Sequence, residues 1–221
     1  MNLYNPAVAQ SNDFLNKVLS VFGLAMLVTA GGVYVGFQYL LPVFAANPLI
    51  MYGLFALELG LIFTSRMWHK KEPLNRLLFS LFTFISGLTI VPLIASFAIE
   101  FGGYDIIFNA LFSTTVMFFA MAMIGWTIKK PLTGMRGFLT MGLIGMIVVS
   151  IIGIFIPWGN TGEMLVSGFG VVLFAGYTMY DIQNLKNYQE DQYILAAMQL
   201  YLDIFNLFIF ILRLTGATSR D

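Results

Sequence analysis

The chain has 221 residues, of which 59% are hydrophobic and 10% are charged, whereas about a quarter of the residues in a soluble domain carry a charge. This composition predicts an integral membrane protein that is surrounded by a lipid bilayer. The formal net charge is zero, so nothing indicates a nucleic-acid partner. Cysteine is absent, which excludes disulfides, thiolate nucleophiles and cysteine metal sites.

Seven apolar stretches are long enough to be membrane helices, because about 20 apolar residues at 1.5 Å rise each cross roughly 30 Å of hydrocarbon. In chain order the predicted helices are Val18–Leu41, Leu49–Ser65, Leu74–Ile99, Ile106–Ile128, Gly137–Ile156, Met164–Leu185 and Tyr193–Leu214. We therefore expect an all-α polytopic membrane protein with a single seven-helix transmembrane domain, 18–214. An N-terminal cytoplasmic tail, 1–17, and a short C-terminal tail, 215–221, complete the chain.

The basic residues predict the orientation. All but two of the eleven Lys and Arg residues lie before the first predicted helix, in the segments after the second, fourth and sixth, or, for Arg76, in the first turn of the third. These segments share one side of the membrane, which the positive-inside rule assigns to the cytoplasm. We therefore expect a multi-pass protein with a cytoplasmic N-terminus. The exceptions, Arg213 and Arg220, lie outside if the last helix crosses fully and inside if it is re-entrant.

Two aspartates, Asp181 and Asp203, interrupt the last two predicted helices. Polar groups inside a bilayer are costly and normally face a cavity or a partner. At 100° per residue, each aspartate shares its helix face with further polar side chains, namely Tyr177 and Asn184 in the sixth helix and Gln199 and Asn206 in the seventh. We expect these two polar stripes to meet.

The chemistry of such a pair is that of a proton sensor. Two neighbouring carboxyl groups in a low-dielectric setting cannot both ionise cheaply, so Asp181 and Asp203 are expected to share one proton. Ca²⁺ prefers six to eight oxygen ligands, and the pair with Asn184, Asn206, backbone carbonyls and water would form a weak calcium shell. Protons and calcium ions would then compete for the same oxygens.

A third embedded charge, Glu58, lies midway along the second predicted helix, and Arg66 follows near the cytoplasmic end. Glu58 has two interpretations: a polar residue that supports the ion pathway, or a structural salt bridge or neutral hydrogen-bonded acid. Arg66 also has two: an ordinary cytoplasmic anchor or an ionic latch. As a latch, Arg66 would hold Asp181 ionised and draw it away from Asp203, which would open the path.

The glycine pairs and the one histidine are expected to be structural. Gly32 and Gly36 form a GxxxG pair, and GLIG (Gly142–Gly145) and SGFG (Ser167–Gly170) add small residues that favour close helix packing. His69 lies in the charged stretch RMWHKKEPLNR, so a solvated loop position is expected. No second ligand accompanies it for a metal site or a catalytic triad.

Four segments resemble one known family. FISGLTIVPLIASF (Phe84–Phe97) is similar to a third-helix signature, and GWTIKKPLTGMRGFLTMGLIG (Gly125–Gly145) to a basic connection between the fourth and fifth helices. LFAGYTMYDIQNL and LYLDIFNLFIFILRL are similar to the last two helices. In this order and on seven helices, they resemble the Bax-inhibitor family (transmembrane Bax inhibitor motif family) over nearly the whole chain. Two details differ from the family. The third-helix signature has Val91–Pro92 where Gly-Pro is common, and the connection between the fourth and fifth helices has Lys130–Pro131 where a Lys/Arg-Asp pair is usual.

The resemblance implies six helices around a central seventh and, as in bacterial members, a proton-regulated calcium leak in the bacterial inner (plasma) membrane. The family's aspartate pair corresponds to Asp181 and Asp203, its arginine near the end of helix 2 to Arg66, and its helix-2 acid to Glu58. Some members act instead by binding a membrane protease.

We therefore expect a pH-sensitive calcium leak channel or transporter that is gated by the aspartate pair, with calcium ions and protons as bound or transported species and no tightly bound cofactor. An enzyme is not expected, because an intramembrane aspartyl protease needs Gly-x-Gly-Asp and Asp203 lies in LYLD. A retinal protein needs a lysine in the seventh helix, which has none. The remaining alternative is a non-transporting interaction protein that modulates a membrane protease or an apoptosis-related partner.

Overall fold

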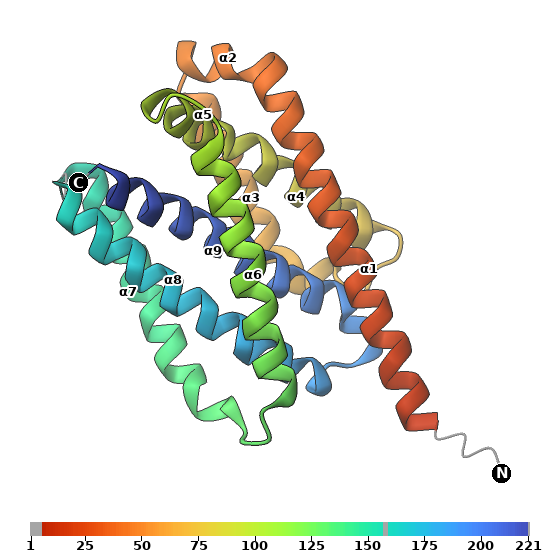
Figure 1. Cartoon of the computed structure of the whole chain (residues 1–221). Coiled ribbons are helices and arrows are strands. Elements are labelled where there is room, and N and C mark those ends of the chain that lie inside the picture. The colour runs from red at the N-terminus through yellow and green to blue at the C-terminus, as the bar shows by residue number, and fades with distance from the viewer. Residues whose placement is uncertain (1–5, 157–158, 221) are drawn as a thin grey trace. The chain divides into compact units, whose positions relative to one another are not determined.

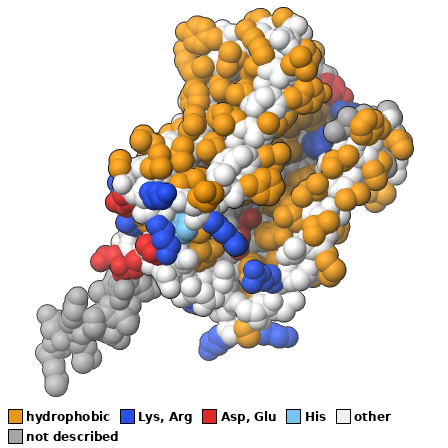
Figure 2. Space-filling view, turned by 180° about the vertical axis from the view of Figure 1, so that it is seen from behind, with side chains coloured by type: hydrophobic (Ala, Val, Ile, Leu, Met, Phe, Trp, Pro, Cys, Tyr) orange, Lys and Arg blue, Asp and Glu red, His pale blue; other side chains and the backbone are white. Residues whose placement is uncertain are grey.

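The structure, a computed structural model, describes residues 6–156 and 159–220. All regular elements in these residues are helices (Figure 1). Seven helical segments are long and apolar enough to cross a membrane, which confirms the predicted all-α fold and the number of spans. On the face seen in Figure 2, hydrophobic side chains cover most of the helices.

The elements follow the predicted order. They are α1 (Pro6–Val35), continued through a π-helical turn (Gly36–Leu40) into α2 (Leu41–Ala46); α3 (Leu49–Trp68); α4 (Leu74–Thr89) and α5 (Val91–Glu100); α6 (Asp105–Thr127); a 3-10 turn (Leu132–Gly134) and α7 (Met135–Phe155); α8 (Gly159–Asn184); 3-10 turns at Leu185–Asn187 and Glu190–Gln192; and α9 (Tyr193–Ser219). The first helix begins at Pro6 instead of Val18, and the last ends at Ser219 instead of Leu214. Hydropathy marks the apolar part of a helix, whereas the backbone continues as helix into its polar flanks.

The third span is interrupted at Ile90, between α4 and α5. The physical cause is Pro92, which has no amide hydrogen for the carbonyl of Leu88 and whose ring clashes with that carbonyl. Consequently α4 ends inside the span, at Thr89.

The last span, α9, is one unbroken helix of 27 residues, which is about 40 Å long at 1.5 Å per residue. This length suits a complete crossing, and the helix contains no turn at which it could re-enter. The third and the last spans are the most buried of the seven, each with 61% of its most apolar stretch buried. The central position of the seventh helix stays a prediction.

The chain forms two compact units, and neither is continuous in sequence. The first unit contains Met1–Ser96 and Lys186–Tyr201, and the second contains Phe97–Leu185 and Leu202–Asp221. The last helix therefore belongs to the first unit up to Tyr201 and to the second unit from Leu202 onwards.

Glycines bring α1 and α4 close together in the first unit. A Cβ atom on Gly32 would overlap the carbonyl oxygen of Phe84, and one on Gly87 would overlap the carbonyl oxygen of Thr29. A Cβ atom on Gly36 would lie 2.6 Å from a valine methyl group. The GxxxG pair, Gly32 and Gly36, is thus at a close helix contact, as the sequence predicts.

In the second unit α8 packs against α6, α7 and α9, and small residues again allow the contacts. Gly125 of α6 faces the backbone of Met179, and Gly142 of α7 faces a leucine side chain of α8. Gly170 of α8 lies under the ring of Phe210 of α9. These contacts hold α8, which carries Asp181, against the part of α9 that carries Asp203.

Acidic partners accompany the two basic residues that depart from the positive-inside pattern. Arg220 donates to both carboxylate oxygens of Glu100, at 2.6 and 2.8 Å, and Arg213 lies 3.3 Å from Glu163. Glu100 ends α5 and Glu163 lies in the first turns of α8, so these pairs mark one end of the second unit. Their opposite charges offset the two arginines locally.

Candidate functional site

The carboxyl groups of Asp181 and Asp203 meet in the interior of the second unit. A side-chain hydrogen bond joins them. Their residues are only 5% and 4% exposed, respectively. Among the described residues, no group hydrogen-bonds Oδ2 of Asp203. The arrangement is a buried pair of acids, joined through one oxygen and with one further acceptor oxygen available.

The connection between α8 and α9 explains how the two aspartates come level. Asp181 lies close to the end of α8, but Asp203 lies well inside α9, so a tight turn would leave them staggered. Instead, the chain leaves the second unit after Leu185, packs in the first unit through Lys186–Tyr201, and returns at Leu202. Asp203 is therefore near the beginning of the part of α9 that packs against α8.

Tyr177 lies one turn before Asp181 on α8 and is also part of the second unit. Its hydroxyl group hydrogen-bonds the side chain of Thr140 of α7, and its ring centroid lies 5.9 Å from that of Phe174. Tyr177 thus links the helix of Asp181 to α7.

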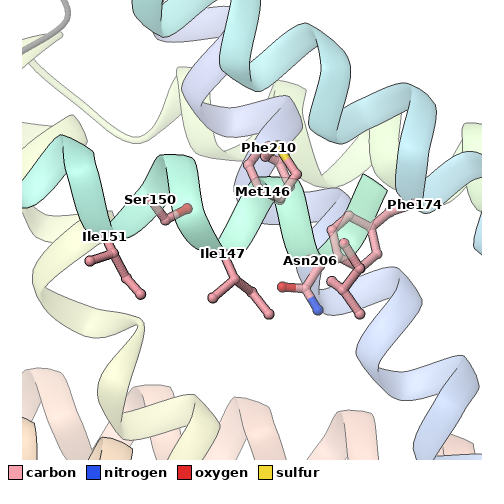
Figure 3. A pocket seen from close by; sticks show the side chains of 8 residues that line it. Met146, Ile147, Ser150, Ile151, Phe174, Asn206 and Phe210 are labelled. Atoms are coloured by element: carbon pink, nitrogen blue, oxygen red, sulfur yellow. The ribbon is translucent and has the colours of Figure 1, made fainter. Parts of the chain in front are cut away.

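Asn206 lies one turn after Asp203 and borders a pocket of about 270 Å³ between α7, α8 and α9 (Figure 3). Its amide group donates to the carbonyl of Leu202 at 2.7 Å, so this donor serves its own helix. The lining is otherwise mostly apolar and consists of Leu143, Met146, Ile147, Ser150, Ile151, Phe174 and Phe210. A lining of this kind suits hydrocarbon better than a hydrated ion.

The remaining predicted residues lie elsewhere. Gln199 belongs to the first unit, where it accepts a hydrogen bond from the hydroxyl of Tyr188. Glu58 and Arg66 also belong to the first unit; Glu58 is 9% exposed, and Arg66 is exposed near the end of α3. Asn184 is the last residue of α8 in the second unit. The role of Arg66 as a latch for Asp181 stays a prediction.

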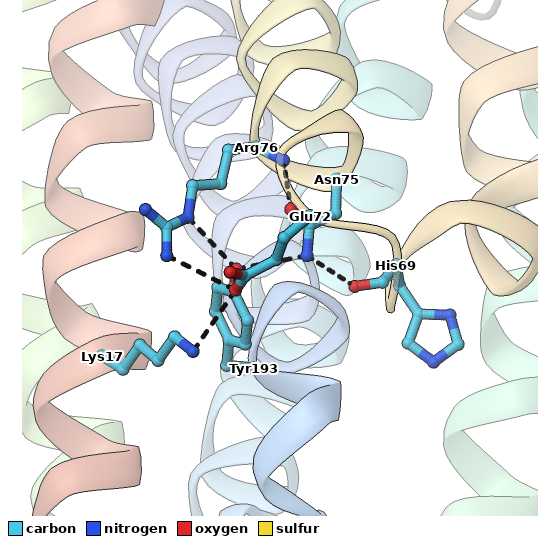
Figure 4. Close-up of polar contacts among 6 residues, drawn as sticks. All are labelled: Lys17, His69, Glu72, Asn75, Arg76 and Tyr193. Carbon is cyan, nitrogen blue, oxygen red and sulfur yellow. Dashed lines mark hydrogen bonds and ion pairs between the residues drawn. The ribbon is translucent and has the colours of Figure 1, made fainter.

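A charged cluster that was not predicted from the sequence joins α1, the α3–α4 connection, α4 and α9 in the first unit (Figure 4). The hydroxyl of Tyr193 donates to Glu72 at 2.7 Å. Lys17 and Arg76 lie 3.5 and 3.4 Å from the same carboxylate oxygen. Arg76 and Asn75 each donate to the Tyr193 hydroxyl at 3.2 Å. Lys17 and Tyr193 lie far from Glu72 and Arg76 in the sequence, so no local pattern could reveal the whole cluster.

His69 corrects the expectation of a solvated loop position, because its residue is only 6% exposed. It continues α3, with its amide bonded to the carbonyl of Ser65 and Nδ1 3.2 Å from the same oxygen. The side-chain amide of Asn75 donates a hydrogen bond to the carbonyl oxygen of His69 at 2.9 Å. The charged neighbours in the sequence are surface residues, whereas this side chain points inward from the end of the helix.

Replacing Glu72 with glutamine is expected to lower the Tm of the detergent-purified protein at neutral pH. The Tyr193 hydroxyl, together with Lys17 and Arg76, holds the pKa of the Glu72 carboxyl below its ordinary value, which is about 4.3. A lowered pKa stabilises the fold above the ordinary value, and this contribution is lost as the pH falls through the lowered pKa. The two Tm curves should therefore converge in acid, and the difference should be small because the cluster is half exposed.

A matched control for this prediction is Glu190→Gln, which removes the same charge from an exposed residue without an ion pair among the described residues. An equal loss of Tm in both variants would show that net charge, and not the cluster, causes the effect.

Comparison with known proteins agrees with the fold. A family model described as "Inhibitor of apoptosis-promoting Bax1" matches residues 11–220. A protein of Campylobacter jejuni is 34% identical over 211 residues, which cover 95% of this chain and 90% of its own. Bax inhibitor 1 of Schizosaccharomyces pombe is 32% identical over 215 residues, which cover 94% of this chain and 77% of the yeast protein. The Golgi anti-apoptotic protein of vaccinia virus is 27% identical over 210 residues, which cover 94% of this chain and 86% of the viral protein.

The family model extends over almost the entire chain, and two of these relatives exceed 30% identity over most of both lengths. The match includes the two buried aspartates and all seven spans. The chain therefore belongs to the Bax inhibitor family of membrane proteins.

Proposed function

We propose that this protein is a pH-sensitive calcium leak in the membrane and that the Asp181–Asp203 pair gates it. The observation that carries the proposal is the buried hydrogen bond between the two carboxyl groups, on two helices long enough to span the bilayer. Ionisable groups inside a membrane normally mark an ion or proton pathway.

The pair suits gating because its charge and its geometry depend on each other. With one shared proton, the hydrogen bond holds α8 against α9. Loss of that proton leaves two negative charges in a low-dielectric interior, where they repel strongly. The repulsion favours separation of the helices and makes more carboxylate oxygens available to a cation.

Calcium enters this proposal as cargo. Ca²⁺ takes six to eight oxygen ligands, and two carboxyl groups fill only part of that shell. Water and backbone carbonyls would supply the rest, which favours weak binding and rapid passage. The family resemblance identified from the sequence points to the same ion.

The proposal includes a location and an orientation. Seven apolar spans make the chain a multi-pass membrane protein, and we place it in the bacterial inner membrane with its N-terminus in the cytoplasm. Arg66 would then lie near the cytoplasmic surface. Its predicted role there is to favour the ionised form of Asp181.

The test is calcium entry into liposomes that contain only the purified protein, measured with an enclosed fluorescent indicator over a series of pH values. We expect a flux above that of protein-free liposomes, rising as the pH rises through the titration of the pair. Flux that does not exceed the protein-free control at any pH would refute the proposal.

One alternative is supported by the relatives' names, since Bax inhibitor 1 and the Golgi anti-apoptotic protein are named for effects on cell death. In this alternative the chain acts by binding a membrane protease or another membrane protein and carries no ion. Absence of flux in the same liposomes, with correctly folded protein, would favour it.

A further inference from the structure

A second buried acid, Glu58, is the centre of a polar cluster in the interior of the first unit. Thr89 Oγ1 lies 3.4 Å from each of the two carboxyl oxygens of Glu58, and the Ser86 side chain hydrogen-bonds the same group. Ser86 also hydrogen-bonds Tyr201, whose hydroxyl lies 2.8 Å from Thr29 Oγ1. The cluster therefore joins α3, α4, α9 and α1.

Each hydroxyl group in this cluster has only one proton to donate. Ser86 and Thr89 donate to carbonyls of their own helix at 3.1 and 3.2 Å, and Thr29 donates to one of its own at 2.9 Å. Between Tyr201 and Thr29 either hydroxyl could be the donor. Thr89 can direct its proton either to its own helix or to Glu58 but not to both, so a proton on Glu58 allows these bonds to form together.

The groups that hydrogen-bond Glu58 in the described part of the first unit are uncharged hydroxyls. The groups that face it are the hydroxyls of Ser86 and Thr89 from α4, and Tyr201 of α9 interacts with it electrostatically. In the described part of the first unit, no ion pair includes Glu58. Arg66 is eight residues further along α3, about 12 Å away along the axis.

The break in the third span lies at the same place. Thr89, which contacts Glu58, is the last residue of α4, and α5 begins at Val91. The C-terminal end of α4, with partial negative charge, and the N-terminal end of α5, with partial positive charge, meet at this break. In membrane transport proteins, interrupted helices commonly lie at ion and proton sites.

We propose that Glu58 is a proton-binding site separate from the aspartate pair and that its proton joins α3 to the break between α4 and α5. The protonated carboxyl donates to Thr89 or Ser86. Loss of the proton leaves a buried anion that Ser86 or Thr89 can stabilise only by turning its proton away from its own helix, and this weakens the contact of α3 with the break. The site lies in the first unit and requires neither calcium flux nor the aspartates.

Infrared spectroscopy of the purified protein at neutral pH tests the proposal directly, because protonated and ionised carboxyl groups absorb at different frequencies. Glu58→Gln, which keeps size and hydrogen bonding, is expected to remove one component of the protonated carboxyl absorption. The control, Glu100→Gln, changes an acid that is paired with Arg220, so it should leave this absorption unchanged. An unchanged absorption in Glu58→Gln would show that Glu58 is ionised and would overturn the proposal.

A second variant tests the contact itself. Thr89→Val replaces the hydroxyl with a methyl group of similar size and is expected to shift the Glu58 component to the frequency of a more weakly hydrogen-bonded acid. Asp203→Asn should leave that component in place, because it acts on the other pair. Loss of the component in Asp203→Asn, with retention in Glu58→Gln, would assign it to the aspartates and contradict the proposal.

Discussion

Replacing Asp203 with asparagine is expected to abolish the pH dependence of calcium flux in proteoliposomes. The substitution keeps the size of the side chain but removes one of the two acids that share a proton, so no coupled titration remains. In the wild type the proton-free population of such a pair changes up to about tenfold per pH unit on the acid side of its titration. The variant should give a nearly constant flux over the same pH series.

Asp181→Asn should have the same effect, and the double variant should add little to either single one, because the two groups act as a unit. The matched control is Asp191→Asn, which makes the same chemical change at an exposed residue paired with Lys70 at 2.7 Å. It should keep the wild-type pH profile. A wild-type profile in Asp203→Asn or Asp181→Asn would exclude the pair as the sensor.

Gly87→Ala is expected to destabilise the protein by about 1–3 kcal/mol, the usual cost of forcing extra atoms into a packed interior. The added Cβ atom would overlap the carbonyl oxygen of Thr29 and lie 3.0 Å from the Cα atom of Gly32. Both are backbone atoms of α1, so no side-chain rotation relieves the clash. At about 2–4 °C per kcal/mol for a chain of this size, the Tm in detergent should fall by roughly 2–12 °C.

Gly31→Ala is the control for this prediction, since a Cβ atom at that position has no neighbour within 4 Å. Alanine is favoured over glycine in a helix by about 1 kcal/mol, so this variant should keep or raise the Tm. Equal losses in both variants would mean that helix propensity, and not the contact between α1 and α4, determines the result.

Much of the fold can be predicted from the sequence because membrane spans are encoded locally. Each span needs a run of apolar residues, and the two aspartates are visible as exceptions within such runs. The break at Ile90 can also be predicted from the sequence, because a proline such as Pro92 in the middle of an apolar run interrupts a helix. Hydropathy alone conceals it, because proline does not reduce the apolar character of the span enough to end it.

Contacts between distant residues could not be predicted in the same way. Gln199 lies on the face of Asp203 by helical periodicity, but α9 changes units between the two residues, so Gln199 meets Tyr188 instead. The partners of Arg220 and of Glu72 are likewise set by how helices from distant parts of the chain pack. Helical periodicity shows which residues share a face but not which neighbour covers it.

The division of α9 between the two units has a consequence for biosynthesis. The first unit contains residues up to Ser96 but also needs Lys186–Tyr201, which leave the ribosome much later. Until then Thr29 and Ser86 lack their contacts with Tyr201, and the polar groups of the first unit lack the helix that covers them. The N-terminal helices therefore stay incompletely assembled in the membrane while the helices of the second unit are inserted. A chain that ends early, before α9, would leave both halves unfinished and open to quality-control proteases.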